Sequence, residues 1–83
     1  MKYYAYVSMG PKNKLYTIIY GKILSERKLD ELYIDIEGLE YRSHIGKINP
    51  FHESGLIASE KYIFDDKYEA QKHIIKEIFG RLK

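Results

Sequence analysis

The chain contains no cysteine among its 83 residues, and this absence removes several classes of chemistry. No disulfide can hold the fold together, and no thiolate can bind a metal or act as a nucleophile. Tryptophan is also absent, and proline occurs only twice. No apolar run approaches the roughly 20 residues that cross a bilayer, and the sequence after Met1 lacks the apolar centre of a signal peptide. We therefore expect a cytoplasmic protein that has no membrane partner.

The residues that are present indicate a folded domain. Hydrophobic residues make up 45% of the chain and aromatic residues 14%, which is far from the composition of disordered segments. A chain of 83 residues is predicted to form a single domain, residues 1–83, around one core. The aromatic residues are nine tyrosines and three phenylalanines. Tyrosine favours strands and half-exposed surfaces, where its ring packs and its hydroxyl meets water.

The net charge of +2 conceals an uneven distribution along the chain. Residues 1–28 carry six basic side chains and one acidic one, whereas residues 29–40 carry five acidic side chains and no basic one. Residues 41–83 carry eight basic and six acidic side chains. Such segregation predicts either a surface with separate basic and acidic regions or charge pairing between neighbouring strands.

Alternation of apolar and polar residues with a period of two predicts five strands. We place them at residues 2–9, 15–24, 32–37, 39–45 and 56–64. Gly10 and Pro11 favour a turn that makes the first two strands a hairpin. Residues 25–31 are mostly polar, which indicates a loop or one short helical turn. Gly38 ends the third strand or instead marks a bulge or bend in one long strand.

The period changes after residue 65, and a helix is predicted at about residues 66–82. Asp65 or Asp66 is the expected N-cap. One side of this helix is largely apolar and comprises Tyr68, Gln71, Ile74, Ile75, Ile78, Phe79 and Leu82. This stripe must pack on the sheet, because nothing else is available to cover it. The predicted fold class is α+β: a small antiparallel β-meander, open or curled into an SH3-like or OB-like partial barrel, with one C-terminal amphipathic helix packed on it.

The stretch INPFHESG, residues 48–55, has no hydrophobic rhythm and contains Asn, His, Glu and Ser. Adjacent residues do not form a catalytic triad, because that geometry is normally assembled from separate parts of the chain. Asn49-Pro50 and Ser54-Gly55 are turn signals. We interpret the stretch as a connection between the fourth and fifth strands. Phe51 is expected to pack beneath it, or to anchor a partner if it is exposed.

Neither a metal site nor a catalytic site is predicted. The three histidines, His44, His52 and His73, match no compact metal-binding spacing. The carboxylates of residues 29–40 are typical of a solvated strand face, although two of them could serve acid–base chemistry or a divalent cation. We therefore expect no enzyme activity and no cofactor.

Two binding functions are consistent with the sequence. The leading hypothesis is a non-catalytic adaptor or inhibitor that binds a protein partner or its own copy through aromatic anchors. An adaptor or inhibitor from a mobile element would have these features. The alternative is a domain for single-stranded nucleic acid or RNA, in which tyrosines of the N-terminal hairpin stack on bases and lysines neutralise phosphates. For the latter, Tyr16 and Tyr20 are further candidates. The candidate binding residues are Tyr4, Tyr6, Lys12, Lys14, Lys22, Phe51 and His52.

Overall fold

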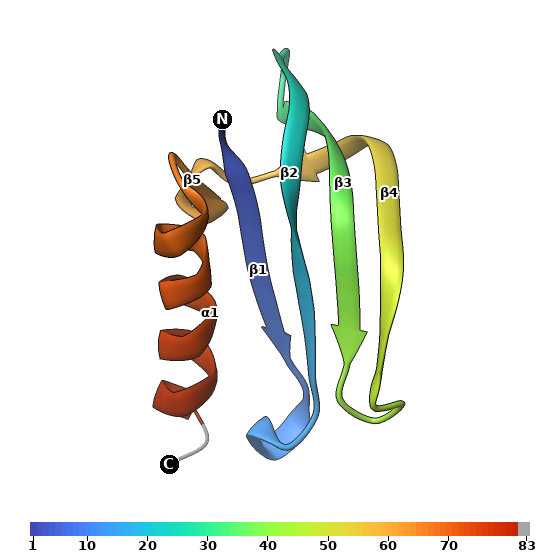
Figure 1. Cartoon of the computed structure of the whole chain (residues 1–83), viewed down its shortest axis with the longest axis vertical. Helices are drawn as coiled ribbons and strands as arrows, with labels where there is room; N and C mark the ends of the chain where they lie inside the picture. The colour runs from blue at the N-terminus through green and yellow to red at the C-terminus, as the bar shows by residue number, and fades with distance from the viewer. Residues whose placement is uncertain (82–83) are drawn as a thin grey trace.

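The computed structural model describes residues 1–81, which form one antiparallel sheet and a C-terminal helix (Figure 1). The strands are β1 (Tyr3–Met9), β2 (Tyr16–Lys28), β3 (Leu32–Arg42), β4 (Lys47–Ala58) and β5 (Ile63–Phe64). Two short 3-10 helices, η1 (Pro11–Asn13) and η2 (Glu60–Tyr62), precede β2 and β5, and the helix is α1 (Lys67–Arg81). The sheet order is β4-β3-β2-β1-β5. The predicted α+β fold is confirmed, and the sheet is open rather than closed into a barrel.

The second strand is longer than the sequence indicates. Residues 25–28, predicted as part of a loop or of one short helical turn, continue β2 and pair with β3, so that Lys28 lies opposite Leu32. The turn between the two strands is short, with the Leu29 amide donating to the Glu31 carbonyl at 2.9 Å. The prediction failed because the backbone ladder does not depend on side-chain hydropathy, and residues 25–28 are exposed.

The predicted third and fourth strands are one strand, β3, which contains Gly38. Gly38 lies opposite Gly21 of β2. A Cβ atom on Gly38 would meet the Tyr20 carbonyl oxygen and the Gly21 Cα atom, and one on Gly21 would lie 2.8 Å from the Glu37 carbonyl oxygen. The two glycines therefore let β2 and β3 approach closely, instead of ending a strand.

Residues 48–55 belong to β4, so their interpretation as a connection was wrong. β4 is an edge strand and most of its residues are exposed, which explains the missing hydrophobic rhythm. Pro50 is tolerated there because the donor it lacks can face solvent. The pairing with β3 shifts between Ile34 and Ile36, where Gly55 has a positive φ of 74° and donates its amide to an Asp35 carboxylate oxygen at 2.9 Å. This bulge coincides with the bend in β4.

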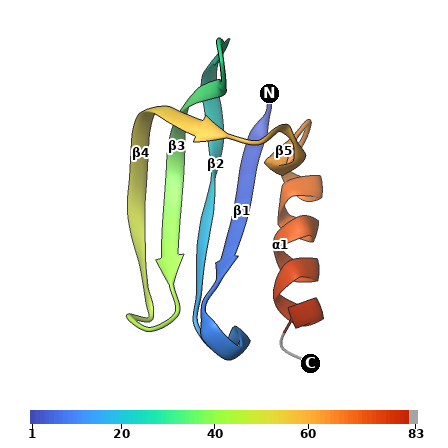
Figure 2. The same cartoon turned by 180° about the vertical axis from the view of Figure 1, so that it is seen from behind.

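The predicted fifth strand, residues 56–64, is also divided. Its first part ends β4, its middle forms η2, and only Ile63–Phe64 pairs with Tyr3 and Tyr4 of β1. The segment from β4 to β5 crosses one face of the sheet, in front of the other strands in Figure 2. We call this the inner face and the opposite one the outer face. The core lies on the inner face and comprises Tyr4, Ile23, Leu32, Ile34, Ile36 and Ala58.

The helix α1 lies beside β1 at one side of the sheet rather than across it (Figures 1 and 2). Asp66 is the N-cap, as predicted, because its carboxylate accepts the Glu69 amide at 2.9 Å. The predicted apolar stripe divides. Ala70, Ile74 and Ile78 are buried or half-buried, whereas Tyr68, Ile75 and Phe79 are exposed and Leu82 lies outside the described residues. A helix beside a strand contacts it along a narrower line than one across a sheet, so only part of the stripe is covered.

Within residues 1–81, no helix has the length and apolarity needed to span a membrane.

Candidate binding surfaces

The outer face carries two successive apolar rows that run across the strands. Residues paired directly across an antiparallel sheet share a face, so the register assigns each row. One row is Ile18, Tyr41 and Ile48, and the next is Tyr20, Leu39 and Pro50. β1 contributes Ala5 and Val7 to the same face, and both are buried next to the helix. The rows on β2, β3 and β4 remain half-buried or exposed.

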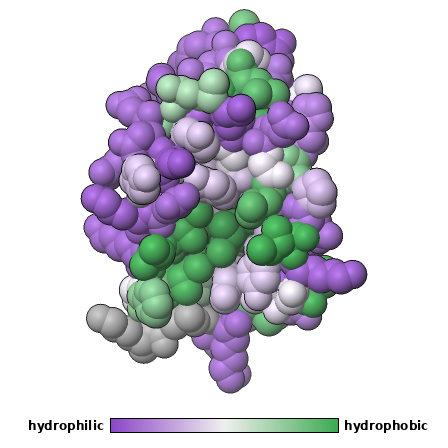
Figure 3. Space-filling model, viewed as in Figure 1, coloured by the Kyte–Doolittle hydropathy of each residue, from purple (hydrophilic) through white to green (hydrophobic). Residues whose placement is uncertain are grey.

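The helix extends this apolar surface. Gln71 donates a hydrogen bond from Nε2 to the Tyr20 hydroxyl at 3.2 Å, which places this side of α1 next to the outer face. Ile75 and Phe79 follow Gln71 at helical spacing and are 55% and 66% exposed. We call the combined surface the outer patch: Ile18, Tyr20, Leu39, Tyr41, Ile48, Pro50, Ile75 and Phe79. The largest apolar area of this face lies in its lower half in Figure 3.

The surroundings of the outer patch are mainly basic. Above it, Lys22, Glu37 and His52 form the next cross-strand row. Below it lie the β1–β2 and β3–β4 turns, which meet at the same end of the sheet (Figure 1). These turns carry no acidic residue. We call the basic side chains at this end of the sheet the basic end: Lys12, Lys14 and His44 in the turns, and Lys47, the first residue of β4, which pairs with Arg42 on the inner face. The three lysines of the basic end form no ion pair with any described residue.

The structure distributes the candidate binding residues over three places. Tyr4, Tyr6 and Phe51 lie on the inner face, where Tyr4 belongs to the core and the other two pack against it. Lys22 and His52 lie on the outer face, in the row above the outer patch. Lys12 and Lys14 are in the basic end. These residues therefore do not form one site.

The tyrosines and lysines of the N-terminal hairpin that were candidates for binding nucleic acid do not share one face. Tyr4 and Tyr6 lie on the inner face, whereas Lys22 lies on the outer face. On the outer face, Tyr3 lies directly opposite Lys22, and Tyr20 lies one row away. Tyr16 packs against Tyr41 with ring centroids 5.9 Å apart, and Tyr3 stacks on Tyr20 at the same distance.

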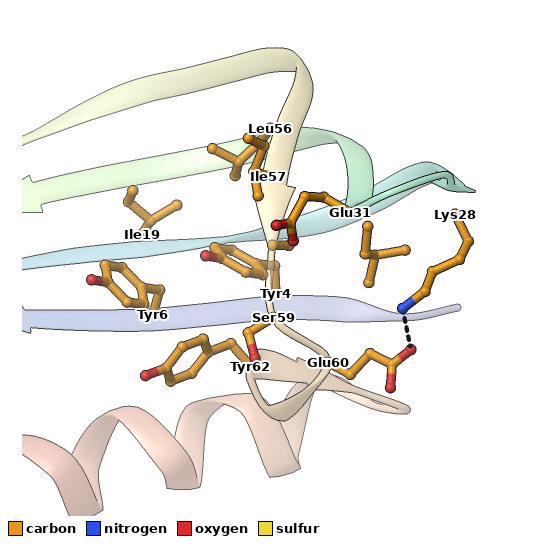
Figure 4. Close-up of a pocket in the computed structure, with 12 residues that line it drawn as sticks. Tyr4, Tyr6, Ile19, Lys28, Glu31, Leu56, Ile57, Ser59, Glu60 and Tyr62 are labelled. Carbon is orange, nitrogen blue, oxygen red and sulfur yellow. Dashed lines mark ion pairs between the residues drawn. The ribbon is translucent and has the colours of Figure 1, made fainter.

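The inner face contains a hollow of about 670 Å³ beneath the crossing segment (Figure 4). Three tyrosine rings line it: Tyr62 meets Tyr6 edge-on at 5.0 Å between centroids and Tyr4 at 6.5 Å. The pKa of Tyr4 is raised to about 12, mainly because the hydroxyl is buried and to a smaller extent because Tyr6 and Tyr62 lie nearby. Its hydroxyl therefore keeps its proton to a more alkaline pH than an ordinary tyrosine does. At the mouth, Lys28 pairs with Glu60 at 3.8 Å.

The described residues contain no group of three His, Asp or Glu side chains placed to hold a metal ion. His44 is in a turn, His52 is on β4, and His73 is on α1. The His73 ring packs against Phe64 at 5.1 Å between centroids, and its Nε2 lies 3.9 Å from a Glu77 carboxylate oxygen.

The pKa of the Asp35 carboxyl is lowered by its hydrogen bonds. The main cause is the Ser25 hydroxyl, which donates to Asp35 at 2.7 Å, and the second is the Gly55 amide. The positive charges of Arg27 and His52 add smaller effects in the same direction.

Sequence reasoning missed most of the outer patch. One signal was available: residues 15–24 are largely apolar on both faces, which indicates that both faces of that strand contact apolar groups. The exposed Ile75 and Phe79 could not be separated from the buried Ile74 and Ile78 by periodicity, because all four fall on one side of the helical wheel.

Comparison with protein-family models, with curated proteins and with solved structures finds no match to this chain.

Proposed function

We propose that this chain is a non-catalytic protein-binding domain that docks its partner on the outer patch. One observation carries the proposal: half-buried apolar side chains of β2 and β3 adjoin exposed ones of β4 and lie on the same face as the exposed ones of α1. Ile48, Ile75 and Phe79 are 66%, 55% and 66% exposed. Single exposed apolar residues are ordinary on protein surfaces, whereas contiguous patches with a polar border mark interaction sites.

The composition of the patch supports a protein partner. It combines aliphatic side chains with two tyrosines, Tyr20 and Tyr41, and aromatic residues are enriched at the centres of protein interfaces. The patch is built on strands held in register and on a helix whose N-terminus is capped, so docking would require little ordering of the backbone.

Single-stranded nucleic acid is less well supported on this surface. Stacking needs aromatic faces open to bases. On the outer face, Tyr16 packs against Tyr41 and Tyr3 against Tyr20. Isoleucine and leucine make up much of the remaining patch, and these side chains offer no stacking surface.

Site-specific photo-crosslinking tests the proposal. A photoreactive amino acid replaces Phe79 in the patch or, as the matched control, Leu29 in the β2–β3 turn, which is 69% exposed. We expect crosslinks to protein from position 79 in cells that express the chain, their loss when Ile48→Asp is added, and none from position 29. Absence of any protein crosslink that depends on Ile48 would contradict the proposal.

Fluorescence anisotropy with short single-stranded DNA and RNA over a salt series tests the alternative. We expect no binding at physiological salt. Tight binding whose affinity falls steeply as salt rises would instead indicate phosphate contacts and replace the protein-binding proposal.

A further inference from the structure

We infer that the partner of the outer patch presents an apolar centre bordered by acidic side chains. This inference rests on the proposed function and specifies its partner. It follows from the distribution of charge around the patch, where the three lysines of the basic end have no ion-pair partner among the described residues. Complementary charge at the border of an interface steers association and excludes partners of the wrong charge.

The opposite end of the molecule has a different charge arrangement. There two lysines form ion pairs, with Lys2 3.6 Å from Glu26 and Lys28 3.8 Å from Glu60. On β3, Arg42 pairs with Glu40 at 3.3 Å on the inner face. The basic end, which borders the outer patch, therefore carries lysines without an ion-pair partner among the described residues.

The row above the patch supplies no excess acidic charge. Glu37 lies between Lys22 on β2 and His52 on β4, so the row holds one acidic and one basic side chain and has no net negative charge. The next acidic residue on the outer face, Asp35, accepts hydrogen bonds from Ser25 and Gly55. Neither carboxylate adjoins the basic end, and the acidic groups that would neutralise Lys12 and Lys14 must come from the partner.

The same distribution disfavours a second copy as the occupant. In a two-fold dimer each copy presents the same surface to the other. A copy docked patch to patch would bring the basic end either onto its own equivalent or onto the row of Lys22, Glu37 and His52. Neither arrangement opposes lysines with uncompensated carboxylates, whereas a partner with an acidic border does so directly.

Selection from a displayed library of random peptides tests this inference without a known partner. The bait is the full chain, in four forms. These are the wild type, Ile48→Asp with Ile75→Asp in the patch, Lys12→Glu with Lys14→Glu in the basic end, and Lys61→Glu with Lys67→Glu at the opposite end of the molecule. The last pair makes the same change in net charge far from the basic end and is the matched control. Circular dichroism confirms that each bait is folded.

We expect the wild type to enrich peptides in which Asp or Glu flanks apolar residues. These peptides should bind the patch variant and the basic-end variant about tenfold or more weakly, as removal of an interface centre or reversal of its border charges typically does. The control variant should bind them as the wild type does.

Each contrary result has a distinct meaning. Peptides that depend on Ile48 and Ile75 but show no acidic enrichment would overturn the inference and leave the proposed function standing. Failure to select any peptide that depends on the patch would overturn both. Self-association in sedimentation velocity that the patch variant abolishes would identify a second copy instead, and salt-sensitive binding of single-stranded DNA through Lys12 and Lys14 would identify nucleic acid.

Discussion

The inner and outer faces are built from alternating residues of the same strands, yet the chain covers them to different extents. On β3, the inward Ile34 and Ile36 are 1% and 0% exposed. On β4, the outward Ile48 is 66% exposed. The chain between β4 and β5 crosses the inner face, whereas the helix covers only the β1 side of the outer face. An apolar strand position therefore does not by itself reveal whether the chain buries it.

This difference separates stability from binding in one small sheet. The inner face supplies the largest completely buried side chains, Ile34 and Ile36, so the free energy of folding should depend mainly on it. The outer patch retains exposed apolar area, which a partner can bury without competing with the core. Substitutions on the two faces are therefore expected to produce different defects.

The largest difference should appear between two isoleucines on adjacent strands. Ile36→Ala removes methyl groups from a fully buried site and should lower the free energy of unfolding by about 2–4 kcal/mol. Ile48→Ala, at an exposed site, should change it by no more than about 0.5 kcal/mol. Urea denaturation followed by circular dichroism measures both. Equal losses for the two variants would mean that the faces do not differ as described.

Two glycines provide a second comparison, with effects of opposite sign. Gly38→Ala places a Cβ atom against the backbone of β2 and should destabilise by about 1–3 kcal/mol. Gly80→Ala, in α1 with no atom within 4 Å of the added Cβ, should stabilise by up to about 1 kcal/mol. Thermal unfolding of the two variants is the measurement. A folded Gly38→Ala protein with wild-type stability would contradict the close approach of β2 and β3.

Gly38 also illustrates what the sequence could predict. Alternation with a period of two identified β1 and most of β2 and β3, and the helical period identified α1, because each of these combines a clear period with apolar residues. It failed for residues 48–55, since an edge strand has no buried face to impose a rhythm, and Pro50 and Gly55 resemble turn residues. The role of Gly38 was left open, because a strand end and a close contact between strands favour the same residue.

The candidate site was harder to predict than the fold. Which tyrosines are buried depends on the segment that crosses the inner face between β4 and β5. The sequence predicted one strand at residues 56–64 instead of this crossing segment, and only Ile63–Phe64 forms β5. Tyr4 therefore belongs to the core, whereas Tyr20 and Tyr41 lie on the outer patch. Exposure of Ile75 depends on the helix lying beside β1 rather than across the sheet, and the sequence does not specify that position.

The burial of Tyr4 on the inner face should make the stability of the protein depend on pH in the alkaline range. The unfolded chain loses the Tyr4 proton near its ordinary pKa of 10.0, but the folded chain retains it until the pKa of about 12. The unfolded state therefore binds fewer protons between these values, and stability should fall as pH rises through this window. Tyr4→Phe should reduce this alkaline loss, measured by urea denaturation from pH 9 to about 11.5. The exposed Tyr68→Phe is the control, and an identical loss in both variants would contradict burial of the Tyr4 hydroxyl.

On the outer face, stability should depend on pH at the acidic end of the range. The effect should be weaker than that of Tyr4, because Asp35 is not fully buried. The pKa of Asp35 is lowered from its ordinary value of 3.8, chiefly by the Ser25 hydroxyl. Its contribution to stability is therefore complete above pH 3.8 and is lost as pH falls through the lower folded value. Ser25→Ala should raise the pKa of Asp35 towards 3.8, measured by carboxyl carbon NMR, while Ser59→Ala leaves it unchanged. If Ser25→Ala has no effect, the Gly55 amide at the β4 bulge, rather than the Ser25 hydroxyl on β2, is what stabilises the charged carboxylate.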